Sequence, residues 1–292
     1  MPLNQPLFRP PAEHDSVLLQ IDVGCPHNAC AFCGMYKSLV HEKRGIPAIR
    51  SIIRAEARAE PDARRIFLAD GDAFSRSAEE LDAILDALAD AFPRLTRVNT
   101  YATGRSIAAH RPDDLVRFKC KKLNTLYLGL ESGDEETLRR MGKGETAEAM
   151  VEAALRAQAA GLKISVMVLL GLAGRAGSLR HAEATAAALN RMQPRLLAAL
   201  RVVPIPGTPL FRWVEADQFE MTTEFETVRE LHRLVAGLRL EATVFRANHS
   251  SNIIPLEGRL PQDQARLLAE LEALLAGGTL DTRSPGPLPG WL

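Results

Sequence analysis

The sequence contains few cysteines and few aromatic residues, and it has no excess of charge of either sign. Only four of its 292 residues are cysteine, 5% are aromatic, and 36 Lys and Arg residues balance 36 Asp and Glu residues. This balance gives no reason to expect a nucleic-acid partner or an acidic tail. With 46% hydrophobic residues, the chain can bury a sizeable core as one large domain or two small ones.

A long hydrophobic run is also lacking. The longest apolar stretch, "ISVMVLLGLAG", is far shorter than the roughly 20 residues that a helix needs to cross a bilayer. The first residues, "MPLNQPLFRPPAEHDS", lack the charged start and apolar stretch of a secretory signal. We therefore expect a cytoplasmic protein without a membrane span.

Three of the four cysteines lie within nine positions, in "DVGCPHNACAFCGMYK" at residues 22–37. In a reducing compartment, clustered thiols are more often metal ligands or catalytic groups than disulfides. Thiolates at Cys25, Cys30 and Cys33 suit three irons of a [4Fe–4S] cluster and leave the fourth iron open for another ligand. A structural zinc site with His27 as fourth ligand is the alternative that the spacing leaves open.

Apolar, strand-like runs alternate with helical patterns along the chain. Six strand-then-helix units predict an α/β fold with a parallel sheet, a partial (β/α)6 TIM barrel followed by a C-terminal helical extension. The cysteines follow the first strand, at the edge where such folds form active sites. The expected segments are an N-terminal extension, the barrel core, an extension that completes or caps the barrel, and a disordered tail, at residues 1–15, 16–215, 216–280 and 281–292.

Five motifs follow one another in a recognisable order over residues 16–210. They are the cysteine motif with Phe32 before its last cysteine, "LADGDAF", "YLGLESGDEETLRRMGKGET", "LLGLAG" and "VVPIPGTPLF". With these motifs the sequence resembles the radical SAM superfamily, in particular the branch containing oxygen-independent coproporphyrinogen oxidases and tRNA methylthiotransferases. The common family spacing is C-x3-C-x2-C, whereas this chain has C-x4-C-x2-C, an expansion that occurs in some branches.

The resemblance implies two cofactors, a [4Fe–4S] cluster on the three cysteines and S-adenosylmethionine (SAM). It implies that Asp72 accepts hydrogen bonds from the SAM ammonium, that Glu131 and Ser132 bind the ribose, and that Lys143 pairs with the carboxylate. The glycines of "LLGLAG" allow close approach of the adenine. The full set of expected cofactor-binding residues is Phe32, Tyr36, Gly71, Asp72, Glu131, Ser132, Lys143, Gly171 and Pro204. A plain Asp-Gly turn, a solvated helix end and a strand-ending turn explain the same motifs without a ligand.

The resemblance also implies a reaction. The reduced cluster passes one electron to SAM, and the resulting 5′-deoxyadenosyl radical abstracts hydrogen from a small-molecule substrate. An external one-electron reductant such as flavodoxin or ferredoxin is the expected partner. Only Cys120 remains outside the triplet, so no auxiliary cluster is expected. A non-catalytic cluster or haem carrier on the same fold, or a zinc-stabilised binding module, are the alternatives.

A polar segment interrupts the apolar pattern near the C-terminus, "FRANHSSNIIPLEGRLPQD" at residues 245–263. Because the core strands already provide the cluster and SAM positions, we expect Asn248, His249 and Asn252 to lie on the substrate side and take part in catalysis. A histidine with a pKa near neutrality suits hydrogen bonding or proton transfer. A hydrogen-bonded cap on the barrel is the alternative interpretation.

Overall fold

The computed structural model describes residues 8–289, and the predictions for residues 1–7 and 290–292 lie outside that range. The chain divides into two compact units. The first comprises residues 1–28, 35–128 and 152–164, and the second comprises residues 29–34, 129–151 and 165–292. Each unit is described by itself.

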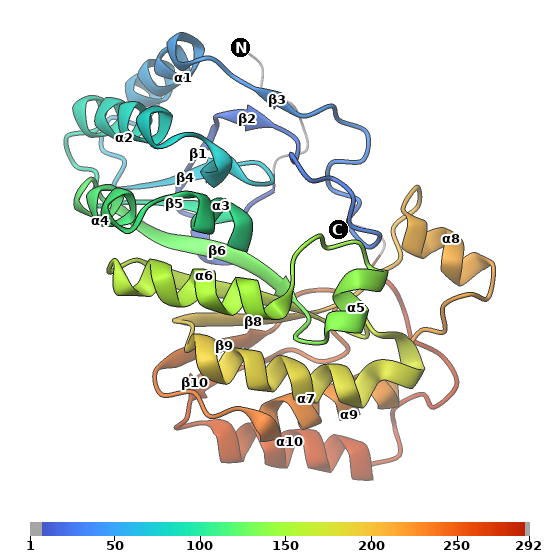
Figure 1. Ribbon diagram of the computed structural model, residues 1–292. Coiled ribbons are helices and arrows are strands. Elements are labelled where there is room, and N and C mark those ends of the chain that lie inside the picture. Colours follow the sequence, from blue (N-terminus) through green and yellow to red (C-terminus); the bar gives the residue numbers. More distant parts are fainter. Residues whose placement is uncertain (1–7, 290–292) are drawn as a thin grey trace. The chain divides into compact units, whose positions relative to one another are not determined.

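The first unit is built on four parallel strands in the order β1-β4-β5-β6. The last three residues of β6 belong to the second unit. The elements (Figure 1) are η1 Pro11–Glu13, β1 Val17–Gln20, β2 Asp22–Val23, β3 Glu42–Lys43, α1 Ile46–Ala59, β4 Arg65–Ala69, η2 Ala73–Ser75, α2 Ala78–Ala91, β5 Arg97–Ala102, α3 Gly104–Ala109, α4 Pro112–Cys120 and β6 Leu123–Glu131.

The second unit continues with strands in the order β7-β8-β9-β10, of which only β10 is antiparallel to its neighbour. Helices α7, α9 and α10 follow one another side by side in this unit (Figure 1). The elements are α5 Glu135–Arg140, α6 Ala147–Ala159, β7 Lys163–Leu170, α7 Gly174–Met192, β8 Leu196–Arg201, α8 Pro209–Glu215, α9 Glu224–Gly237, β9 Thr243–Ala247, β10 Leu256–Leu260 and α10 Gln264–Ala276.

Local sequence signals explain where the helices begin and end. Ser77 caps α2 in a capping box with Glu80, and Thr223 caps α9 in the same way with Glu226. Gly161 adopts a φ of 82° just after α6, a conformation that favours glycine. No helix within residues 8–289 is long and apolar enough to cross a membrane.

The predicted fold class is confirmed. Each of β1, β4, β5, β6, β7 and β8 is parallel to its printed neighbours and is followed by a helix, as a (β/α)6 arrangement requires. Among the described strands, β1 pairs only with β4 and β10 only with β9, so the strands form no closed barrel. The chain is an α/β protein with a mostly parallel sheet, consistent with a partial TIM barrel.

The C-terminal extension is not purely helical, as the sequence pattern suggested, because it also contains β9 and β10. The five residues of β9 alternate between buried and exposed, a period that is hard to detect in so short a segment. Part of the tail that was expected to be disordered makes defined contacts. The guanidinium of Arg201 donates hydrogen bonds to the carbonyls of Pro285 (2.6 Å) and Pro287 (2.7 Å).

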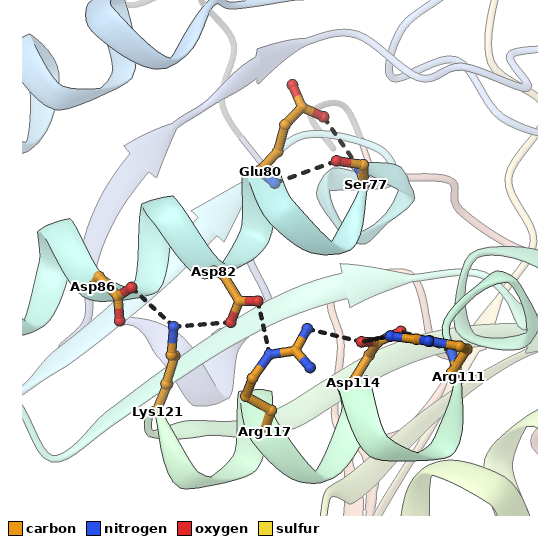
Figure 2. A network of polar contacts seen from close by, with 8 residues as sticks. All are labelled: Ser77, Glu80, Asp82, Asp86, Arg111, Asp114, Arg117 and Lys121. Carbon is orange, nitrogen blue, oxygen red and sulfur yellow. Dashed lines mark hydrogen bonds and ion pairs between the residues drawn. The ribbon is translucent and has the colours of Figure 1, made fainter.

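Ion pairs join α2 and α4 on the outside of the first unit (Figure 2). We call this group the α2–α4 ion-pair network. Its members are Asp82, Asp86, Arg111, Asp114, Arg117 and Lys121. The network lies on the helices that cover the strands, away from the strand ends where the predicted site residues are found.

Candidate cluster and cofactor site

The first predicted cluster ligand, Cys25, is half-buried in the first unit, two residues after β2. The backbone N–H of Gly71 donates to the carbonyl of Gly24 (3.0 Å), which holds the turn after β4 against the cysteine. A Cβ atom at Gly71 would lie 2.4 Å from the Cβ of Cys25 and 2.9 Å from its Sγ. Only glycine therefore fits at this predicted cofactor-binding position without displacing the cysteine.

Asp72, the next predicted site residue, is buried at the start of η2. Its Oδ2 accepts a hydrogen bond from the hydroxyl of Thr103 (2.8 Å), which follows β5. Asp70, two positions earlier, has a φ of 81° and accepts a hydrogen bond from the Gln20 amide (2.8 Å). Burial raises the pKa of Asp70 to about 6, against the opposing effect of Gln20. The sequence analysis missed Asp70, although "LADGD" contains it.

Tyr36 is buried in the first unit, where its ring packs edge-on against Phe8 at 5.8 Å between centroids. Its carbonyl accepts a hydrogen bond from the Asn28 amide (2.7 Å), and the ammonium of Lys37 donates to the Asn28 carbonyl (2.6 Å). These contacts fold residues 28–37 back on themselves. Tyr36 thus helps to define the conformation of the cysteine loop.

Cys30 and Cys33 lie in the second unit, where both are half-buried. The N–H of Cys33 donates to the carbonyl of Cys30 (3.4 Å), so the two cysteines bracket a tight turn. The turn is attached on two sides, because the N–H of Ala31 donates to the Met141 carbonyl (2.8 Å) and its carbonyl accepts from the N–H of Leu210 (3.0 Å). The second half of the cysteine loop therefore has a fixed backbone.

Side-chain packing supports the same segment. Phe32 packs against an apolar group that includes Leu172 and Val202, residues that follow β7 and β8. A Cβ at Gly34 would lie 2.6 Å from the Cγ2 of Ile205. Pro204, beside Ile205, is buried in the loop after β8. The predicted positions Phe32 and Pro204 thus lie in segments that pack together.

Glu131 and Lys143 form an ion pair in the second unit, with 3.1 Å between Oε1 and Nζ. Glu131 is the last residue of β6 and has a φ of 62°, an uncommon conformation for a residue with a side chain. Burial lowers the pKa of Lys143, but Glu131 and Cys30 outweigh it and raise the pKa to about 12. Lys143 therefore stays charged, as pairing with a carboxylate requires.

Ser132 has a different environment from the one predicted. Its side chain is fully buried, and its hydroxyl lies 2.7 Å from Nδ1 of His181 while accepting a hydrogen bond from the N–H of Asp134 (2.9 Å). The hydroxyl is thus used inside the protein. The structure does not present it for the predicted contact with a ribose.

Gly171 follows β7 with a φ of 77°, and its N–H donates to Oε1 of Glu230 (2.7 Å). The hydroxyl of Ser178 donates to the other carboxylate oxygen of Glu230. The sequence analysis did not identify Ser178, His181 or Glu230. Their signal was the spacing of Ser178, His181 and Thr185, which places three polar side chains on one face of α7.

The predicted substrate-side residues lie in the loop between β9 and β10. Nδ1 of His249 accepts from the N–H of Ser251 (3.1 Å), and the Asn252 amide donates to the Ala199 carbonyl (2.9 Å). Arg201 donates to the Ser251 carbonyl (2.5 Å), so the loop folds onto the end of β8. Oδ1 of Asn252 is buried without a hydrogen-bond partner among the described residues. The exposed Asn248 lies apart and donates to Glu257 (3.1 Å).

The cysteines suit an iron–sulfur cluster by their chemistry. All four lie within the described range and none forms a disulfide. The space beside Cys25 exists because residue 71 is glycine, and the charged Lys143 lies near Cys30. Within residues 8–289, no three His, Cys, Asp or Glu side chains form a ready-made metal site. The assignment of ligands therefore rests on the donor set and on comparison with known proteins.

The family model described as the radical SAM superfamily matches residues 19–175, more than half of the chain. A comparison with curated protein sequences found no match. Two solved structures with the same fold are the [FeFe]-hydrogenase maturase HydG from Carboxydothermus hydrogenoformans and Elp3 from Methanocaldococcus infernus. HydG is 19% identical over 88% of this chain and 57% of its own, with a TM-score of 0.51. Elp3 is 15% identical over 92% of this chain and 65% of its own, with a TM-score of 0.56.

A third similar structure is coproporphyrinogen III oxidase (HemN) from Escherichia coli. It is 13% identical over 76% of this chain and 51% of its own, with a TM-score of 0.58. At these identities the likeness extends to the fold. The chain spans less than two thirds of the length of these three proteins.

Proposed function

Because the chain belongs to the radical SAM superfamily, we propose that it cleaves SAM reductively and uses the 5′-deoxyadenosyl radical to abstract hydrogen from a small-molecule substrate. Membership implies a [4Fe–4S] cluster and SAM as cofactors. When bound, the cluster supplies the single electron that breaks the C5′–S bond. The observation that carries the proposal is the cysteine motif within the matched range, with Gly71 packed directly on Cys25.

The three thiolates of Cys25, Cys30 and Cys33 are the proposed cluster ligands. Three protein ligands leave one iron of a cubane cluster open, and that iron is the proposed site of SAM. The attached backbone around Ala31 keeps two of the ligands in place, and Gly71 allows the turn after β4 to approach the third. The charge of Lys143 favours the thiolate form of Cys30.

Residues at the strand ends are the proposed contacts of SAM. Asp72 accepts hydrogen bonds from the ammonium, Lys143 pairs with the carboxylate, and Glu131 binds the ribose. The loops with Gly171 and Pro204 flank the adenine. Support comes from the Glu131–Lys143 ion pair, which is the kind of contact that a bound carboxylate and ribose would share or replace.

His249 and Asn252 are the proposed substrate-side residues. Burial lowers the pKa of His249, so its imidazole is neutral near pH 7 and able to accept a proton. Nδ1 is occupied by Ser251, which leaves Nε2 for a substrate, and Oδ1 of Asn252 is buried without a partner among the described residues. An external one-electron reductant of the flavodoxin or ferredoxin class and a cytoplasmic location complete the proposal.

The test is anaerobic reconstitution followed by incubation with dithionite and SAM. We expect about four irons and four sulfides per chain, and slow formation of 5′-deoxyadenosine detected by chromatography. Cys25→Ala, Cys30→Ala and Cys33→Ala should each abolish 5′-deoxyadenosine, while the matched control Cys120→Ala should not. Gly71→Ala should lower the iron content, because the new Cβ collides with Cys25.

Two outcomes would replace the proposal. An intact cluster that yields no 5′-deoxyadenosine would favour the carrier alternative. Colourless protein that holds zinc through the same cysteines would favour the binding module.

A further inference from the structure

Five buried polar side chains form a group in the second unit that the proposed function does not use. They come from the turn after β6, from α7 and from α9, and each is at most 1% exposed. We call this group the Glu230 cluster. Its members are Ser132, Ser178, His181, Thr185 and Glu230.

Two of these side chains bind the turn after β7. Glu230 accepts hydrogen bonds from the N–H of Gly171 (2.7 Å) and from the hydroxyl of Ser178. Nε2 of His181 lies 3.5 Å from Oε1 of Glu230, and the ring also hydrogen-bonds the backbone of Leu169. The carboxyl group and the imidazole thus both contact the main chain at the end of β7.

The other side of the cluster binds the turn after β6. Nδ1 of His181 lies 2.7 Å from the hydroxyl of Ser132, and Thr185 accepts from the N–H of Gly133 (2.9 Å). Ser132 in turn accepts from the N–H of Asp134 (2.9 Å). A continuous set of contacts therefore runs from the turn after β6, through α7 and α9, to the turn after β7.

A purely structural role does not explain this chemistry. Apolar residues of similar volume stabilise a buried helix interface as well as or better than a buried polar group. Here the polar groups bond main-chain atoms of the two turns, where Glu131 and Gly171 have positive φ values of 62° and 77°. Such backbone conformations persist when the surroundings hold them in place.

We propose that Glu230 and His181 are positioning residues that hold the turn with Glu131 and the turn with Gly171 in one fixed arrangement for a bound cofactor. Neither side chain is placed to touch SAM, since both are buried between helices and strand ends. The identity of the ligand rests on the proposed function. The fixed arrangement of the two turns rests on the contacts alone.

Three variants on α9 separate positioning from stability. Glu230→Ala removes the acceptor of the Gly171 N–H, whereas Glu230→Gln keeps an acceptor and a similar volume. Leu234→Ala is the matched control, because Leu234 is a buried residue of the same helix and its loss destabilises the protein without removing a contact to either turn. If Glu230→Ala does not fold, His181→Leu replaces it as the test of the turn after β6.

The first measurement is hydrogen exchange in peptides that contain Gly171 and residues 131–134, with no SAM present. We expect faster exchange at Gly171 in Glu230→Ala, faster exchange at residues 131–134 in His181→Leu, and wild-type protection in Glu230→Gln. Leu234→Ala should raise exchange in α9 without this local effect. Equal exchange at the two turns in Glu230→Ala and Leu234→Ala would overturn the proposal.

The second measurement is the dissociation constant for SAM in reconstituted protein, by equilibrium dialysis. We expect Glu230→Ala to weaken binding by about tenfold, which is typical for loss of a residue that orients a binding group, with near wild-type binding in Glu230→Gln and Leu234→Ala. Unchanged affinity in Glu230→Ala would contradict the positioning role. If the wild type itself binds no SAM, the proposed function fails, and the exchange measurement decides the fixed arrangement of the turns by itself.

Discussion

The α2–α4 ion-pair network joins six charged side chains on the outside of the first unit (Figure 2), whereas the Glu230 cluster buries one carboxyl group and one imidazole in the second unit. Both connect two helices. In the first, Arg117 and Lys121 of α4 pair with Asp82 of α2 at 2.7 and 2.9 Å. In the second, Ser178 of α7 donates to Glu230 of α9.

The difference shows that exposure matters more than the number of contacts. Charges near solvent are hydrated when an ion pair breaks, so each exposed pair adds little stability and none is required. A buried carboxyl or imidazole group has no such replacement, and every lost contact leaves a polar atom unsatisfied. The network with fewer charges therefore has the larger effect on structure.

The largest effect is expected from removing the buried carboxyl group. Glu230→Ala leaves the Gly171 N–H and the Ser178 hydroxyl without their partner and opens a cavity, so we expect the free energy of unfolding to fall by about 3 kcal/mol. Denaturant unfolding measures this change. A loss no greater than that of an exposed ion pair would remove the distinction between the two networks.

The next effect is a pH dependence within the buried pair. Burial raises the pKa of Glu230 from 4.5 to about 7 and lowers that of His181 from 6.5 to about 4. The folded protein therefore binds an extra proton at Glu230 between these values, so stability falls as pH rises. At His181 the folded protein binds fewer protons, so stability rises with pH. In the wild type the two contributions oppose each other.

Glu230→Gln removes one of the two opposing contributions. We expect the stability of this variant relative to the wild type to increase by up to about 3 kcal/mol between pH 4.5 and pH 7. Unfolding at several pH values measures the difference, and titration of all other groups cancels in the comparison. A constant difference over this range would mean that Glu230 does not titrate with a raised pKa.

The smallest effect is expected in the α2–α4 ion-pair network. Lys121→Ala breaks the contacts with Asp82 (2.9 Å) and Asp86 (2.8 Å), and we expect a loss of about 0.5 kcal/mol. The loss should shrink in 1 M salt, where exposed charges are screened. Thermal unfolding at low and high salt measures both. A loss comparable to that of Glu230→Ala would place the two networks in one class.

Much of the fold was predictable from local signals. The capping boxes at Ser77 and Thr223 and the glycine after α6 have fixed spacing and a direct physical cause, and the structure contains all three. The six strand-then-helix units were visible for the same reason, since each strand is apolar and several residues long. The β9 strand was missed because five alternating residues before a polar loop give too short a period.

The candidate site was predictable where the motif itself makes the contact. The sequence placed Gly71 beside the cofactor, and the structure adds that its missing side chain makes room for Cys25. Ser132 was predicted to bind the ribose, but its partner His181 lies 49 positions later in the chain. A pairing at that separation leaves no local pattern. Glu230 was hidden for a similar reason, since a glutamate in an amphipathic helix predicts an exposed position.

The measurement that tests the central claim most directly is the electron paramagnetic resonance spectrum of the dithionite-reduced, reconstituted protein, recorded with and without SAM. If Cys25, Cys30 and Cys33 hold a [4Fe–4S] cluster with one open iron, the reduced protein gives a cluster signal, and SAM changes that signal by binding to the open iron. The signal should be absent in Cys33→Ala and retained in Cys120→Ala. A cluster signal that SAM leaves unchanged, or one that survives in Cys33→Ala, would contradict the account.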